Sequence, residues 1–225
     1  MNILKLTGLL LILLPVAFNI IFFLLQKNFE YPDILRKPTD YILSRFNAGG
    51  RQLIMTWYAF AFTGVIFIPV AFLVQQTLAS EDTPYLPFAT TIGVLAGLVQ
   101  CLGLIRWTFL VPYLSKTYFE PEATQATRDS IAVVFQAFHR YAGVAIGEHL
   151  GYLFTSIWTA LIALAVTQSP LFTPWLGWIG IIPAIGIFIG IFEEGGFKAA
   201  GAINAISYIL WSLWLIALGM ILFLT

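Results

Sequence analysis

Three ionisable side chains that could bind an anion or exchange a proton lie within apolar stretches of this chain. Arg106 lies near the end of one stretch, and Glu148 and His149 lie near the start of the next. Burying such a charge in a membrane costs about 3 kcal/mol or more, and intramembrane ionisable residues are usually functional. A guanidinium binds oxyanions, and an imidazole titrates near neutral pH. These residues are therefore the centre of a candidate polar site.

Arg106 and Glu148 are expected to lie at similar depths. Arg106 is about 8 Å from the end of its apolar stretch, and Glu148 is about 6 Å from the start of the next. Because consecutive spans run antiparallel, both depths are measured from the same face of the membrane. We expect a charge pair between Arg106 and Glu148; in the alternative, Arg106 extends toward the lipid head groups.

Further polar side chains fall at the same depth and extend the site to a candidate ligand pocket. Its predicted members are Arg106, Glu148, His149, Tyr152, Asn204 and Glu193. His149 would either exchange protons or donate a hydrogen bond to Tyr208 or Asn204. Glu193 and Glu194 end the fifth span, and they form either a solvated loop or the acidic rim of a cavity that faces the cytoplasm.

The elements that must position these groups are membrane-spanning helices. Hydrophobic residues make up 60% of the chain, charged residues make up 10%, and the mean hydropathy is +0.89, which excludes a water-soluble domain of this size. A bilayer core needs about 20 apolar helical residues. The stretches that meet or nearly meet this length are 6–25, 53–74, 88–111, 144–166, 175–192 and 199–224. We predict an all-α, polytopic membrane bundle of six helices in a single domain, 1–225.

The first stretch resembles a signal peptide only superficially, because it is too long and no small-residue cleavage site follows it. Basic residues concentrate in the first, third and fifth connections, whereas the second and fourth contain none. The distribution of basic residues in short loops sets orientation. We therefore expect both termini on the non-cytoplasmic side and the odd-numbered connections in the cytoplasm.

The fourth span is preceded by a predicted amphipathic helix that begins near Pro121 and Glu122. Its apolar stripe is predicted to consist of Ile131, Val134, Phe135, Phe138, Tyr141 and Ala142. His139, on the polar face, is expected to be solvated. A continuous helix over 122–166 would be about 68 Å long, so it must protrude, bend near Gly143 or lie on the membrane surface. Small residues at i+4 spacing, Gly143, Gly147 and Gly151, predict close approach of another helix on one face of this span.

The first connection, residues 26–50, contains a second candidate helix over 39–46. Gly49 and Gly50 would end it. Its alternating apolar and polar residues suit a helix in the membrane interface. The connection is then either a solvated turn with an anchor or a loop that gates a substrate.

Composition disfavours several other classes of site. A net charge of zero gives no basic patch for nucleic acid, and the single cysteine, Cys101, excludes an internal disulfide and multi-cysteine metal sites. His139 and His149 would lie about 15 Å apart on one helix and cannot ligate one haem iron. We expect neither metal nor cofactor, with the lipid bilayer and a small or lipid-like ligand as partners.

Several segments are similar to one bacterial family of multi-pass membrane proteins. They are Tyr31-Pro-Asp-Ile-Leu-Arg36, Leu104-Ile-Arg-Trp107, Val111-Pro-Tyr-Leu114, Phe138-His-Arg-Tyr-Ala-Gly-Val-Ala-Ile-Gly-Glu-His-Leu-Gly151, Ile203-Asn-Ala-Ile206 and Trp211-Ser-Leu-Trp214. The family they resemble is domain of unknown function 4386. The resemblance implies a bacterial inner-membrane setting, and it assigns no activity and no catalytic residues.

The leading functional hypothesis is binding or proton-linked movement of a small or lipid-like molecule through the polar pocket. Glu148 and His149 would titrate, and Arg106 would bind an anion or compensate charge. The alternatives are a membrane-embedded enzyme that acts on lipid or quinone-like substrates and a non-catalytic membrane assembly subunit.

Overall fold

The computed structural model describes residues 2–225, and every regular element in that range is helical. Six helical runs in it are long and apolar enough to cross a membrane. They are α1 (Ile3–Phe29), α2 (Thr39–Leu78), α3 (Leu86–Tyr118), the continuous run of α4 (Gln125–Phe138), η2 (His139–Leu150) and α5 (Gly151–Gln168), then α6 (Pro174–Ile189) with η3 (Gly190–Phe192), and α7 (Ala200–Leu224). The prediction of an all-α bundle of six spans in an integral membrane protein is confirmed.

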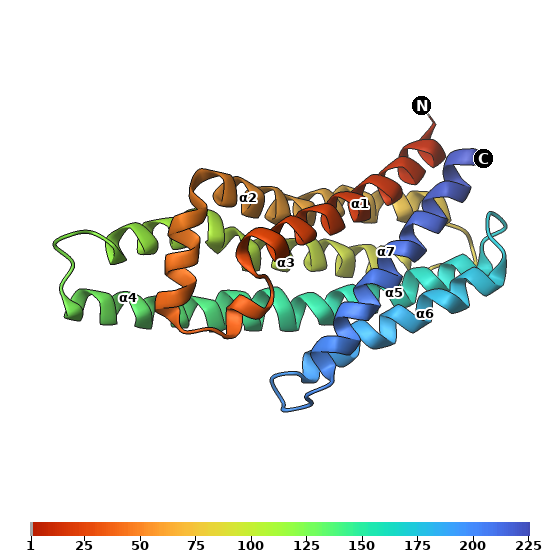
Figure 1. Ribbon diagram of the computed structural model, residues 1–225. Coiled ribbons are helices and arrows are strands. Elements are labelled where there is room, and N and C mark those ends of the chain that lie inside the picture. The colour runs from red at the N-terminus through yellow and green to blue at the C-terminus, as the bar shows by residue number, and fades with distance from the viewer. Residues whose placement is uncertain (1) are drawn as a thin grey trace.

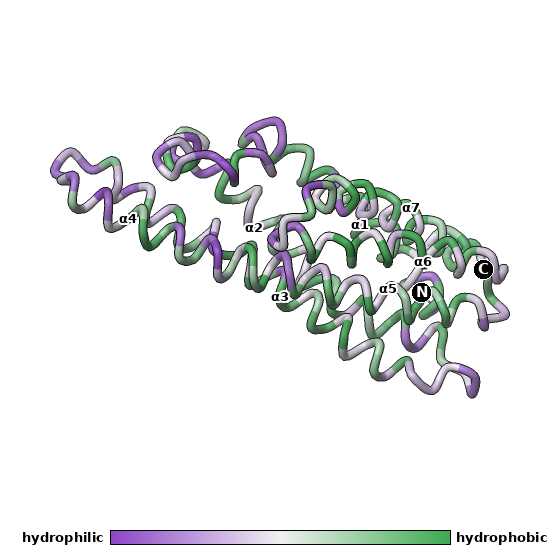
Figure 2. The backbone as a smooth tube through the Cα atoms, turned by 90° about the horizontal axis from the view of Figure 1, so that it is seen from below, coloured by the Kyte–Doolittle hydropathy of each residue, from purple (hydrophilic) through white to green (hydrophobic). Residues whose placement is uncertain are grey.

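Consecutive spans run antiparallel, which places both chain termini at one end of the bundle (Figure 1). We call this the terminal end; it also holds residues 79–85 and 169–173, where the Tyr85 hydroxyl donates to Gln168 Oε1 at 2.9 Å. The other end, which we call the loop end, holds residues 30–38, 119–124 and 193–199. Hydrophilic residues gather toward the loop end, around α4 and the start of α2 (Figure 2).

We call the half of the bundle nearest the terminal end the terminal half, and the half nearest the loop end the loop half. The terminal half has an apolar core. Its buried members include Leu11, Phe67, Trp158 and Leu215. Helix α1 packs against α7 where Gly8 faces Gly219: a Cβ on Gly8 would lie 2.6 Å from the Gly219 carbonyl oxygen. Such backbone contacts let membrane helices cross closely without a hydrophobic driving force.

The predicted short helix in the first connection is confirmed. Helix α2 begins at Thr39 and breaks at Gly50, which has φ 51° and ψ −149°, a conformation open essentially to glycine alone. The first part of α2 therefore runs across the bundle before the long span begins (Figure 1). Its apolar side chains, Ile42, Leu43 and Phe46, are buried in protein, so this face packs on the bundle.

The aromatic side chains beneath this crossing helix form the core of the loop half. The indoles of Trp57 and Trp107 stack with centroids 4.7 Å apart at 11°, and Phe29 meets both rings edge-on. Aromatic pairs in such arrangements stabilise beyond the area they bury. This cluster, together with the crossing helix, fixes the position of the loop that follows α1.

The amphipathic helix before the fourth span begins at Gln125, three residues later than the predicted start at Glu122. Thr124 sets this start, because its Oγ1 accepts from the Thr127 backbone N–H at 3.2 Å, a regular N-cap. The helix continues without a break into η2 and α5. With the end of α3 it forms a hairpin that protrudes beyond the other helices (Figure 1), one of the three outcomes expected for a run of this length.

Candidate functional site

A cavity of about 1020 Å³ lies in the loop half of the bundle. Helices α1, α3 and α7, the π-helical segment η2 and the connections with η1 (Asp33–Arg36) and η3 contribute to its wall. Five of the chain's 11 basic and four of its 11 acidic side chains line it. These are Arg36, Lys37, Arg106, Arg140, Lys198, Asp33, Glu148, Glu193 and Glu194. All six predicted pocket residues are among the lining residues.

Arg106 is the most buried charge in this cavity, at 8% exposure. Its Nη1 donates to the Gly103 carbonyl oxygen, and its Nη2 lies 3.5 Å from His139 Nδ1. The guanidinium also lies 5.2 Å from the ring centre of Trp107. Among residues 2–225 no carboxylate forms an ion pair with it. Arg106 therefore faces the cavity without a counter-charge in direct contact.

The predicted Arg106–Glu148 charge pair is not a direct ion pair in the structure. Both side chains line the same cavity, but Arg106 is directed at the backbone of η2 beside Gly143. A Cβ on Gly143 would lie 2.5 Å from Arg106 Nη2, so the guanidinium occupies the place of the missing side chain. Glu148 lies one turn further along η2 and is half-buried.

The three glycines of the fourth span all lie against α3. Gly143 faces Arg106, Gly147 faces the backbone of Gly103, and Gly151 faces Gln100. Over His139–Leu150 the helix has π-helical hydrogen bonding. This segment carries Glu148 and His149, which both line the cavity.

His139 is not solvated, and that prediction is wrong. The imidazole is 9% exposed and stacks on the Phe135 ring at 5.8 Å, with the ring planes 6° apart. The stripe that packs is Ile131, Phe135 and His139, whereas Val134 and Phe138 from the predicted apolar stripe are exposed. Ile131, Phe135 and His139 follow i, i+4, i+8 spacing in the sequence, so a shared helix face could be predicted. Because histidine is polar, the sequence prediction places His139 on the opposite, polar face.

The remaining predicted residues occupy different parts of the wall. Asn204 is buried, and its Nδ2 donates to the Ile187 carbonyl oxygen at 3.2 Å. Tyr152 lies with its ring centre 5.9 Å from that of Tyr208. His149 is exposed at the cavity wall, and Glu193 lies at the loop end.

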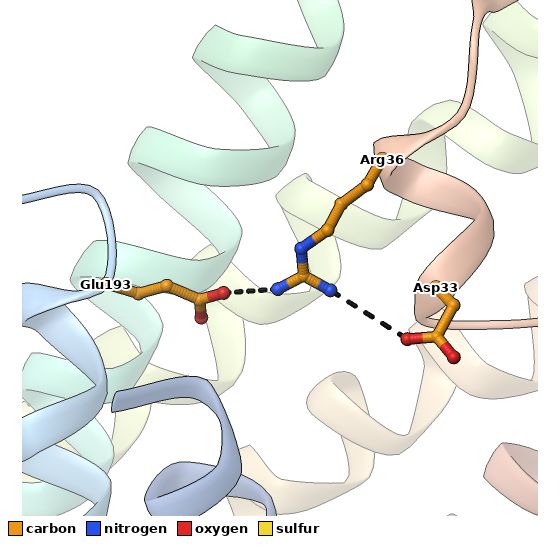
Figure 3. Close-up of polar contacts among 3 residues, drawn as sticks. All are labelled: Asp33, Arg36 and Glu193. Atoms are coloured by element: carbon orange, nitrogen blue, oxygen red, sulfur yellow. Dashed lines mark hydrogen bonds and ion pairs between the residues drawn. The ribbon is translucent and has the colours of Figure 1, made fainter. Parts of the chain in front are cut away.

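Glu193 forms an ion pair with Arg36, which lies in the first connection (Figure 3). Asp33 Oδ1 lies 3.9 Å from Arg36 Nη1. The bridge joins the segment after α1 to the segment before α7. Sequence reasoning did not find Arg36 as a site residue, because no local pattern links two positions 157 residues apart.

Tyr31 is a second residue that sequence reasoning missed. It lines the cavity in the first connection, with its ring packed edge-on against Trp57 at 5.2 Å. Burial raises the pKa of the Tyr31 phenol above its usual range. The hydroxyl is therefore neutral at physiological pH and available to donate into the cavity.

Comparison with known protein families finds a match to Domain of unknown function (DUF4386) over residues 6–219. No curated protein and no solved structure matches the chain.

Proposed function

The chain belongs to the family of domain of unknown function DUF4386, and we propose that it binds a small or lipid-like molecule in its loop-half cavity and moves it with protons. The observation that carries this proposal is the gathering of nine charged side chains around one cavity of about 1020 Å³ in an otherwise apolar bundle. Ligand pockets typically occupy about 300–1,000 Å³ and combine apolar walls with a few convergent polar groups.

Each polar group has a chemical role in this proposal. Arg106 binds an anionic group of the ligand or compensates its charge, while Glu148 and His149 exchange the proton. Tyr31, Tyr152 and the rim residue Glu193 would contribute hydrogen bonds. The arrangement supports this division because Arg106 is buried and has no direct counter-ion among residues 2–225, whereas Glu148 and His149 line the cavity.

The cavity is proposed to open toward the cytoplasm of a bacterial inner membrane. The connections at its end carry Arg36, Lys37 and Lys198, and basic residues in short loops favour the cytoplasmic side. Both termini would then be non-cytoplasmic.

The test is mass spectrometry of small molecules retained by protein purified gently from its membrane. Wild type is expected to retain a molecule that Glu148→Gln and Arg106→Gln lose. The matched control is Glu81→Gln, because Glu81 is exposed at the terminal end, away from the cavity. Liposomes loaded with the identified molecule would then show whether its movement changes the internal pH.

Other outcomes of the same experiment would overturn the proposal. A retained molecule that wild type converts to a new chemical form, and that Glu148→Gln leaves unchanged, would indicate a membrane enzyme. Wild-type protein that retains nothing, with cavity variants that behave normally in cells, would indicate an assembly subunit.

A further inference from the structure

Helices α1 and α7 cross at the terminal end and separate toward the loop end (Figure 1). They are in backbone contact at Gly8 and Gly219. Further along, the Asn19 Nδ2 donates to Ser212 Oγ at 2.9 Å. Beyond that bond both helices contribute to the cavity wall, so the space between them belongs to the cavity.

The cavity reaches the outer, lipid-facing surface of the bundle between these two helices. Phe23 on α1 and Ile209 on α7 both line it, yet they are 60% and 55% exposed. Ala202 and Ala205 of α7 also line it and are exposed, and their short side chains leave the gap unfilled. Exposed apolar side chains on both borders of an opening are suited to contact hydrocarbon.

The opening has two defined edges: an upper edge, nearer the terminal end, and a lower edge, at the loop end. At its upper edge the rings of Phe18 and Tyr208 stack with centroids 6.2 Å apart, next to the Asn19–Ser212 hydrogen bond. At its lower edge the Arg36–Glu193 ion pair joins the two connections (Figure 3). The opening thus lies between a point midway along α1 and the loop end, which is the level of one lipid leaflet.

Arg106 provides the group inside the cavity that could bind an anion. A guanidinium has five N–H donors, and the contacts in the structure are one carbonyl oxygen and one imidazole nitrogen. A buried charge requires a partner that compensates its lost hydration. An oxyanion in the cavity would provide it, and bidentate pairing with carboxylate or phosphate is the geometry a guanidinium favours.

We infer that the ligand is an amphiphile with an oxyanion head group and a hydrocarbon tail, which enters from the lipid between α1 and α7. Its head group pairs with Arg106, and its tail lies against Phe22, Phe60 and Ile209 toward the opening. This inference rests on the proposed function and names the ligand class of the same cavity.

Equilibrium binding to delipidated protein in detergent tests the ligand class with four probes. Palmitate and hexadecyl phosphate carry an oxyanion on a long chain, hexadecanol carries the chain alone, and inorganic phosphate carries the anion alone. We expect both charged amphiphiles to bind at least about tenfold more tightly than hexadecanol, since a hydrogen bond to a charged group is stronger than one between neutral groups. Inorganic phosphate is expected to bind weakly.

The possible failures of this experiment are distinct. Hexadecanol binding as tightly as palmitate would overturn the anionic head group and leave the proposed function standing. Inorganic phosphate binding as tightly as hexadecyl phosphate would identify a free anion as the ligand and overturn the hydrocarbon tail. Absence of binding by all four probes, in protein that also retains nothing on gentle purification, would overturn the inference and the proposed function together.

Variants of Arg106 test the head-group contact. Arg106→Gln is expected to weaken palmitate binding about tenfold or more and to leave hexadecanol binding unchanged, because only the charged contact is lost. Arg106→Lys keeps the charge and should restore part of the palmitate affinity. Equal palmitate affinity in wild type and in a folded Arg106→Gln variant would contradict the assignment.

Two variants that change no charged residue test the route of entry. Ala205→Phe adds a bulky ring to the edge of the opening, whereas Ile206→Phe adds one at the next position, which is exposed but does not line the cavity. In liposomes, 5-doxyl-stearate should quench tryptophan fluorescence severalfold more slowly in Ala205→Phe than in wild type or Ile206→Phe. Identical quenching rates in the two variants would overturn entry between α1 and α7.

Discussion

The two halves of this bundle use the same helices in opposite ways. In the terminal half, α1 and α7 meet through Gly8 and Gly219, and the pocket beside them measures about 10 Å³, room for about one water molecule. In the loop half, the same two helices border a cavity of about 1020 Å³ lined by nine charged side chains. Close packing at one end lets the helices diverge at the other without losing their relative position.

The halves also differ in how their polar groups are satisfied. In the terminal half, some buried polar groups pair across helices: Thr7 and Thr77 hydroxyls lie 3.1 Å apart, and Trp214 Nε1 donates to the Leu176 carbonyl oxygen at 2.9 Å. In the loop half, Arg106 has no carboxylate partner in the part of the chain that the structure describes. The terminal half therefore holds α1 and α7 together, whereas the loop half surrounds a cavity with charged side chains.

The largest expected effect is at the close crossing of the terminal half. Gly8→Val would place a side chain within 2.7 Å of two backbone atoms, Gly219 O and Phe223 N, which cannot move independently of α7. We expect a loss of at least about 2 kcal/mol in the free energy of unfolding, measured by thermal unfolding in detergent. Ala17→Val, exposed on the same helix, is the control. Equal melting temperatures for the two variants would contradict the division into halves.

The glycines of the fourth span sharpen the comparison, because each would place a new methyl group against a different neighbour. Gly147→Ala meets the Gly103 backbone and should cost about 2 kcal/mol of unfolding free energy. Gly143→Ala meets only the flexible Arg106 guanidinium and should cost about 1 kcal/mol. Gly151→Ala makes an ordinary contact with Gln100 and should gain up to about 1 kcal/mol from helix propensity. The same unfolding measurement ranks them, and a reversed order would show that α3 and η2 are not in this register.

A smaller effect is expected from the fixed hydrogen bonds of the terminal half. Trp214→Phe removes the donor to Leu176 and should lower the unfolding free energy by about 1 kcal/mol more than Trp158→Phe does. Trp158 is the matched control because it is buried, and its Nε1 has no hydrogen-bond partner within residues 2–225. Equal losses would indicate that the hydrogen bond to Leu176 contributes nothing.

The smallest effect on stability is expected at the Arg36–Glu193 bridge. Arg36 is 63% exposed and Glu193 is 32% exposed, and exposed ion pairs contribute at most about 1 kcal/mol. A double-mutant cycle with Arg36→Ala and Glu193→Ala should give a coupling energy below about 1 kcal/mol, which decreases as salt is added. A coupling of several kcal/mol would mean that the lower edge of the opening is part of the rigid framework.

Much of the fold could be predicted from the sequence, because spans, helix breaks and small-residue faces are local patterns. The six apolar stretches and the break at Gly49 and Gly50 are examples. The predicted members of the cavity wall follow from depth alone, since Arg106 and Glu148 had to lie near the same face of the membrane.

The remaining features depend on contacts between distant parts of the chain. The Arg36–Glu193 bridge and the entry of Tyr31 into the cavity have no local signature. His139 was misplaced because helical spacing indicates which residues share a face but not which face packs. The direct contact of Arg106 and Glu148 failed for a related reason: equal depth does not fix the direction in which a guanidinium points when a glycine, Gly143, leaves room beside it.

The even number of crossings has a practical consequence for assigning the compartment of the cavity. Because both ends of the chain emerge together, opposite the three connections of the loop end, a reporter enzyme fused after Thr225 samples the side away from the loop end. One fusion to an enzyme that is active on only one side of the membrane therefore determines which side the loop end faces.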